Sequence, residues 1–124
     1  MTLSVEDKKI LLAVARQSIV GAVKRTPPIQ FDPVHFRSEV LISHAGAFVT
    51  ITKEGHLRGC VGFLRGERAL YQTVSEAAAS AAMHDTRFLP LSEPELDLIE
   101  LEISVLSPMR RIDDVKEIEV GKHG

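Results

Sequence analysis

Cys60 is the residue in this chain whose chemistry is best suited to a reaction, because a thiolate is a strong nucleophile. It is the only cysteine among 124 residues, and Arg58, Gly59 and Gly62 lie within two positions of it. A nearby guanidinium favours the thiolate form, and glycines let a substrate come close to the backbone. One interpretation of the segment is therefore a nucleophilic site. The alternative is a buried structural cysteine, the usual environment of a free thiol.

A nucleophilic cysteine also needs a base, and the sequence offers several histidines without choosing among them. His44, His56 and His84 are the candidates. No two of the five histidines have the i, i+3 or i, i+4 spacing of helical metal ligands, and one cysteine cannot build a structural zinc site. We therefore expect no metal and no cofactor. The glycines around Cys60 match neither the P-loop nor the dinucleotide-binding fingerprint.

Asp85 and Arg87 form a second candidate group, at the predicted end of a helix. A helix C-terminus disfavours a negative charge, so Asp85 needs a partner. One interpretation is a pair with Arg87 that fixes the following loop. The other is that Asp85 or Arg87 reaches the surface that carries Arg58 and Cys60. The candidate catalytic residues are Cys60, Arg58, Asp85 and Arg87, and the candidate substrate-binding residues are Gly59, Gly62, His84 and Glu76.

Hydrophobic periodicity predicts the elements that must position these residues. Helical spacing predicts helices over residues 4–25 and 68–84, and strict alternation predicts a strand over 98–106. Residues 47–52 and 57–63 predict a β-hairpin around a turn at 53–56. Residues 26–36 are typical of a loop, and residues 112–120 of a turn with a short strand at its end. The pattern predicts a single α+β domain in which helices pack on an antiparallel sheet.

The two glycines beside Cys60 carry a structural prediction of their own. Glycine is a poor residue for a strand interior, so another group must approach the backbone closely or the strand must bulge. Alternation places Arg58 and Cys60 on one face of the strand unless a bulge separates them.

Composition and charge narrow the classes of function. Hydrophobic residues make up 44% of the chain and charged residues 26%, as in an ordinary globular domain. No apolar stretch approaches a membrane span, no signal peptide is evident, and a lone cysteine suits the cytoplasm. Residues 1–68 carry ten basic and six acidic side chains, whereas residues 69–124 carry five and eleven. Few aromatic residues and no basic run make nucleic-acid binding a distant alternative.

Four stretches in order resemble one known family. They are Gly46-Ala47-Phe48-Val49-Thr50, Leu57-Arg58-Gly59-Cys60-Val61-Gly62, residues 85–91 followed by Glu95-Leu96, and Gly121-Lys122-His123-Gly124. Together they are similar to the AMMECR domain family, also called AmmeMemoRadiSam system protein A. The resemblance covers almost the whole chain. The family positions that carry over are Arg58, Gly59, Cys60, Gly62, Asp85, Arg87 and Phe88.

The resemblance implies a mixed α/β domain with an antiparallel sheet, and functional association with a Memo-like protein and a radical S-adenosylmethionine enzyme. It also implies that residues 1–124 are the N-terminal and central part of a domain that continues further. Such a part leaves apolar surface and a sheet edge uncovered, which predicts either self-association into a homo-oligomer or marginal stability.

Two functions follow from the residues and the resemblance together. The first is an enzyme or enzyme component that acts on a small or peptide substrate, with Cys60 near Arg58 as its site. The second is a non-catalytic protein-binding or scaffold module for the same partners.

Overall fold

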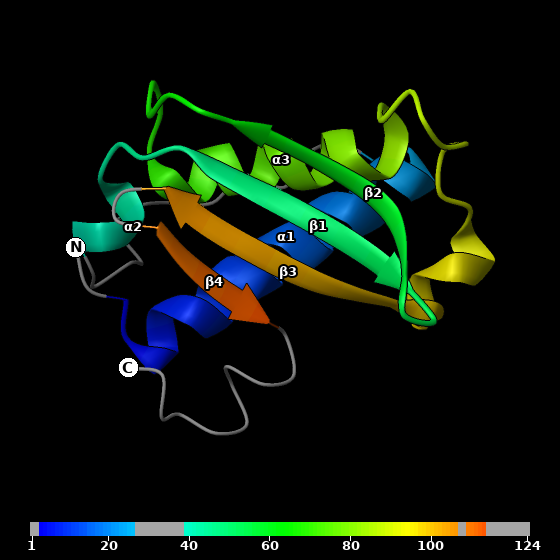
Figure 1. Ribbon diagram of the computed structural model, residues 1–124, viewed down its shortest axis with the longest axis horizontal. Helices are drawn as coiled ribbons and strands as arrows, with labels where there is room; N and C mark the ends of the chain where they lie inside the picture. The colour runs from blue at the N-terminus through cyan, green and yellow to red at the C-terminus, as the bar shows by residue number, and fades with distance from the viewer. Residues whose placement is uncertain (1–2, 27–38, 107–108, 114–124) are drawn as a thin grey trace.

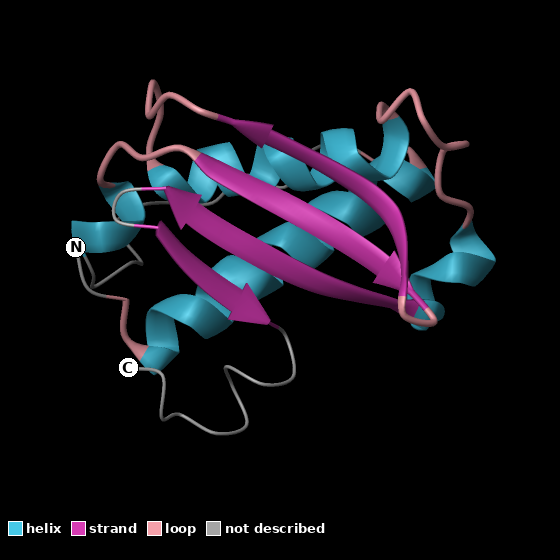
Figure 2. Cartoon of the chain, viewed as in Figure 1, coloured by secondary structure: helices cyan, strands magenta, loops and turns pink. Residues whose placement is uncertain are grey.

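The chain folds into a four-stranded antiparallel sheet with helices packed on one face. The computed structural model describes residues 3–26, 39–106 and 109–113. The strands lie in the order β2-β1-β3-β4, and Figure 1 shows the sheet across the front with α1 and α3 behind it. Helices and strands are distinguished by colour in Figure 2. The predicted α+β fold is confirmed. The elements are α1 (Val5–Lys24), α2 (Glu39–Ile42), β1 (Ala47–Lys53), β2 (His56–Phe63), α3 (Leu70–Met83), the 3-10 helix η2 (Glu93–Leu98), β3 (Ile99–Leu106) and β4 (Met109–Asp113).

Helix α1 begins and ends where the local sequence predicts. The backbone N–H of Asp7 donates to Ser4 Oγ at 3.0 Å, and the N–H of Ser4 donates to Asp7 Oδ2 at 3.0 Å. This reciprocal capping box satisfies two of the unpaired donors at the helix start. Arg25 ends the helix in the left-handed conformation, with φ of 57°. The helix packs on α3 and the sheet through a buried stripe that includes Leu11, Ala15 and Ile19.

The β1–β2 hairpin contains the irregularity that the glycines suggested. Its turn has two consecutive positive φ angles, 52° at Glu54 and 81° at Gly55, the combination that two-residue hairpin turns favour. Ile51 pairs with Gly59, but the next residue, Thr52, pairs with Leu57. Arg58 is therefore the extra residue of a bulge, and this removes it from the regular alternation that it would share with Cys60.

The two faces of the sheet have different surroundings. On β3 the alternating residues Ile99, Leu101, Ile103 and Val105 are buried toward α1 and α3, which confirms the predicted alternation. In β1 the corresponding buried residues are Ala47, Val49 and Ile51. The other face carries residues that are half-buried or exposed, including Phe48, Thr50, Cys60, Glu100 and Glu102. We call it the open face.

Two elements were not predicted. Helix α2 has only four residues, and β4 has a sequence without alternation that is held by pairing with β3. The prediction of a turn was wrong at residues 112–113, which belong to β4. Residues 27–36 of the predicted loop, residues 114–120 and the Gly121–Gly124 stretch lie outside the described residues. None of the helices in the described part of the chain combines the length and apolar character that a membrane crossing requires.

Candidate functional site

Cys60 lies on the open face of β2, directly opposite Thr50 of β1. Its Sγ is 3.2 Å from Thr50 Oγ1, and the residue is half-buried. Thr50 is in turn paired with Glu102 of β3, so a thiol, a hydroxyl and a carboxylate follow one another across three strands. Among the described residues, Thr50 is the side chain that is hydrogen-bonded to the sulfur, and no histidine makes such a bond.

Gly59 and Gly62 are both explained by close approach of another part of the protein. A Cβ at Gly59 would overlap the carbonyl oxygen of Ala81 in α3, and a Cβ at Gly62 would overlap the ring of Phe48. The prediction of close backbone approach is confirmed. The approaching groups belong to the chain itself, so the space beside each glycine is already filled.

Asp85 and Arg87 meet the backbone of Cys60. Asp85 follows the last turn of α3, and its Oδ2 accepts the N–H of Cys60 at 2.9 Å. Arg87 donates to Asp85 through its backbone N–H at 3.1 Å, its Nε at 3.0 Å and its Nη2 at 2.8 Å. The same Nη2 reaches the carbonyl oxygen of Cys60 at 3.5 Å. We call Asp85 and Arg87 the edge cap, because β2 is the outer strand of the sheet.

The edge cap fixes the charge state of Asp85. Hydrogen bonds from the Arg87 side chain and then from the Cys60 N–H hold the pKa of the Asp85 carboxyl well below its usual range. The carboxylate therefore stays ionised at ordinary pH and acts as an acceptor. The side chain of Asp85 is only 6% exposed, whereas that of Arg87 is 58% exposed. This geometry combines the two interpretations of Asp85, since it pairs with Arg87 and also reaches the strand that carries Cys60.

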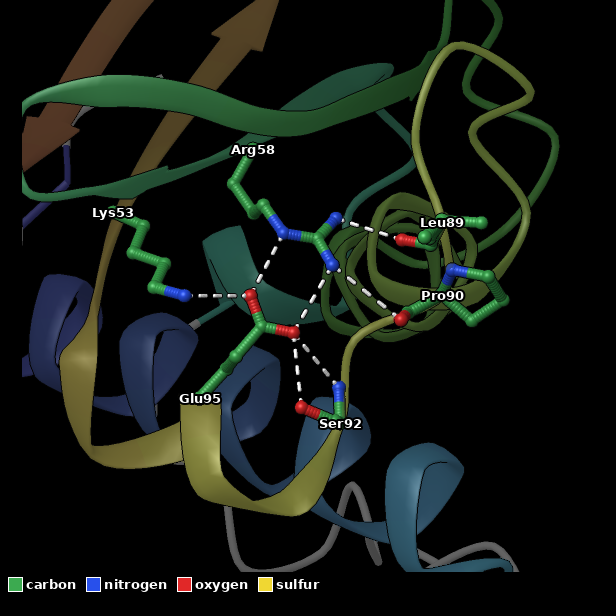
Figure 3. Close-up of polar contacts among 6 residues, drawn as sticks. All are labelled: Lys53, Arg58, Leu89, Pro90, Ser92 and Glu95. Carbon is green, nitrogen blue, oxygen red and sulfur yellow. Dashed lines mark hydrogen bonds and ion pairs between the residues drawn. The ribbon is translucent and has the colours of Figure 1, made fainter.

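Arg58 lies in a different cluster, shown in Figure 3. Its Nε donates to Glu95 Oε2 at 2.9 Å and its Nη2 to Glu95 Oε1 at 3.1 Å, a bidentate pair. Its Nη1 and Nη2 also donate to the carbonyl oxygens of Leu89 and Pro90, at 2.7 and 3.4 Å. We call this group, with Lys53 and Ser92, the Arg58 cluster.

Glu95 is the centre of the Arg58 cluster. Lys53 Nζ donates to its Oε2 at 3.1 Å, and the N–H and Oγ of Ser92 donate to its Oε1, each at 3.1 Å. Arg58, above all, lowers the pKa of Glu95 to about 2. The guanidinium of Arg58 therefore fastens the connection between α3 and β3 to the hairpin. In the described part of the chain, the guanidinium of Arg58 makes no hydrogen bond to Cys60.

The remaining candidate residues lie apart from Cys60. Glu76 pairs with Arg68 near the start of α3, whereas Cys60 lies beside the end of that helix. His84 is the exposed C-cap of α3, and His44 and His56 are also exposed. Within the described ranges, no group of three or more His, Cys, Asp or Glu residues could hold a metal ion.

Thr50 and Glu95 lie within the stretches that resemble the family, but neither was named as a candidate site residue. Thr50 could have been found from the hairpin, because a two-residue turn at 54–55 and a one-residue bulge place it opposite Cys60. Glu95 had no local signal, since it lies 37 residues from its partner Arg58.

Comparison with known proteins agrees with this fold. The model of the AMMECR1 family matches residues 12–124. A protein of Methanopyrus kandleri, MK0488, is 37% identical over 98% of this chain and 62% of its own length. A protein of Methanothermobacter thermautotrophicus is 36% identical over 86% of this chain and 54% of its own length. The crystal structure of the uncharacterized protein PH0010 from Pyrococcus horikoshii has a TM-score of 0.67 and 30% identity, over 77% of this chain and 48% of that one. The chain thus spans about half to three-fifths of these relatives.

Proposed function

The chain belongs to the AMMECR1 family, and we propose that it is a non-catalytic binding module for a Memo-like protein and a radical S-adenosylmethionine enzyme. The observation that supports this proposal is that the charged side chains around Cys60 are engaged within the chain. Arg58 is bound by Glu95 and two carbonyl groups, and Asp85 accepts from Cys60 and Arg87. Residues committed to such contacts stabilise a fixed surface, and they have few donors left for a substrate.

The contact surface in this proposal is the open face around Phe48, Thr50 and Cys60. Its backbone is held from both sides, by the edge cap on β2 and by the Arg58 cluster at the hairpin. A preformed surface loses little conformational entropy on binding, which favours a docking role.

Binding measurements with the purified partner proteins test the proposal. Calorimetry or pull-down should detect binding by the wild-type chain, retention of binding by Cys60→Ser, and loss of binding by Arg58→Ala, which loosens the surface. Glu93→Gln is the matched control, because Glu93 is exposed and outside the Arg58 cluster. Failure of the folded wild-type chain to bind either partner would contradict the proposal.

A second candidate function is thiol-dependent catalysis, and one observation favours it. The Cys60 sulfur lies on the open face, half-buried, with a hydroxyl at 3.2 Å. An activated thiol reacts with an alkylating reagent faster than free cysteine at neutral pH. Reaction rates of Cys60 with iodoacetamide, compared with those of free cysteine, measure this directly. A rate no faster than that of free cysteine would remove the candidate.

A further inference from the structure

The outer edge of β2 presents backbone groups that another strand could pair with. In an antiparallel pair, the N–H and C=O of one residue point to the same side of the strand. The N–H of Cys60 donates to Asp85 and its C=O is reached by Arg87, so both groups point away from β1. Outward-facing backbone groups on an edge strand are a template for association with another chain whenever nothing else pairs with them.

The edge cap reproduces the hydrogen bonds that a neighbouring strand would make. A strand beside β2 would accept the N–H of Cys60 and donate to its carbonyl oxygen, and Asp85 and Arg87 do the same at 2.9 and 3.5 Å. We propose that the edge cap is an autoinhibitory contact that blocks strand addition to β2. When it is removed, β2 of a second copy of the chain takes its place.

The sequence of β2 suits antiparallel pairing with itself. A two-fold axis at Cys60 sets this residue opposite its own copy and sets Gly59 opposite Val61 of the second copy, within the part of β2 that follows the bulge. Like charges directly opposite each other would oppose pairing, and this arrangement contains none. The proposal is independent of the partners discussed above, because it needs only this chain.

The loop that carries the edge cap can move without unfolding the core. His84, Thr86 and Arg87 are exposed. The next fixed points are Leu89, whose carbonyl oxygen accepts from Arg58 at 2.7 Å, and Leu91, which is 4% exposed and whose N–H donates to the carbonyl oxygen of Ala82 at 2.9 Å. Displacement of residues 84–88 therefore leaves the buried anchor of the connection in place.

Light scattering on the eluate of a sizing column, over a range of protein concentrations, tests the proposal. For Asp85→Ala, we expect the average mass to rise toward that of two chains as concentration increases, and to rise further than for wild type. Glu93→Gln removes one exposed carboxylate from the same connection and should behave as wild type. Circular dichroism verifies that each variant is folded.

A suppressor variant identifies the strand that pairs. Proline at an outward-facing position of an edge strand removes the donor and is tolerated there. Asp85→Ala combined with Cys60→Pro should therefore stay as monomeric as wild type. Amide exchange adds a second measurement: in Asp85→Ala, the Cys60 amide should exchange faster than wild type in dilute solution and more slowly when concentrated.

Three results would overturn the proposal. The first is a folded Asp85→Ala that associates no more than wild type at any concentration. The second is association that persists in the double variant with Cys60→Pro, which would locate it elsewhere. If Asp85→Ala does not fold, Arg87→Ala replaces it, because Arg87 is exposed and its loss uncovers the Cys60 carbonyl. In that case the third contradicting result is an Arg87→Ala variant that is folded and associates no more than wild type.

Discussion

Gly59 and Gly62 are three residues apart in one strand, so alternation places them on opposite sides of the sheet. Each is packed against a different group. Gly59 is buried against the backbone of α3, where a Cβ would overlap the carbonyl oxygen of Ala81. Gly62 is half-buried on the open face, where a Cβ would overlap the ring of Phe48. A helix backbone packed in the core cannot move aside cheaply, whereas a half-buried side chain can change its rotamer.

The difference shows that one short motif serves two separate functions in packing. Gly59 brings α3 against the strand, and the end of that helix carries Asp85 to the edge of β2. Gly62 gives room to a side chain on the surface that carries Cys60. The predictions below test this asymmetry, from the largest expected effect, on the covered side of the sheet, to the smallest, on the open side.

Gly59→Ala should produce the largest loss of stability. The added methyl group must displace the backbone of α3, so we expect unfolding to become easier by about 3 kcal/mol, the upper part of the usual range for overpacking. Urea unfolding followed by circular dichroism measures this. A variant within about 0.5 kcal/mol of wild type would mean that α3 does not restrict this position.

Gly62→Ala should cost less, about 1.5 kcal/mol, because the Phe48 ring can turn away on the open face. The same unfolding experiment compares the two glycine variants directly. Combining Gly62→Ala with Phe48→Leu should recover part of the loss, since the smaller side chain leaves room for the methyl group. Equal effects at Gly59 and Gly62 would contradict the asymmetry between the faces.

Glu95→Gln removes the carboxylate at the centre of the Arg58 cluster, which holds the bulge of β2. It should lower the free energy of unfolding by about 1 kcal/mol at neutral pH. The folded-state pKa of Glu95 is lowered to about 2 from an ordinary value of 4.5. Its contribution is therefore complete above about pH 4.5 and is lost as the pH falls toward 2. The stability difference between wild type and variant, from urea unfolding, should shrink over that window. A difference that is constant with pH would exclude this ion pair as its source, and Glu93→Gln provides the control.

Cys60→Ser should have the smallest effect on the free energy of unfolding, below about 0.5 kcal/mol, because the side chain is half-buried and a serine hydroxyl can also bond to Thr50. Urea unfolding measures this, and a larger loss would contradict it.

Arg58→Ala should leave the alkylation rate of Cys60 unchanged, since the guanidinium points to Glu95 and two carbonyl groups. A strong dependence of that rate on Arg58 would show that the guanidinium reaches the thiol in solution.

Local signals were sufficient for most elements of the fold. Ser4 and Asp7 defined the start of α1, the turn residues Glu54 and Gly55 defined the hairpin, and alternation defined β3. Each of these depends on residues a few positions apart. Strand β4 has no such pattern and exists through its pairing with β3, so it escaped prediction.

The sequence by itself determined that Cys60 lies in a β-strand between two glycines that need close approach, because backbone preferences are local properties. Only the tertiary structure decided what approaches them and where each charge goes. Arg58 turns to Glu95 because the bulge removes it from the face of Cys60, and Asp85 reaches the Cys60 backbone because α3 ends beside β2. Those contacts join residues 25 and 37 positions apart, and their geometry depends on how helix and sheet pack.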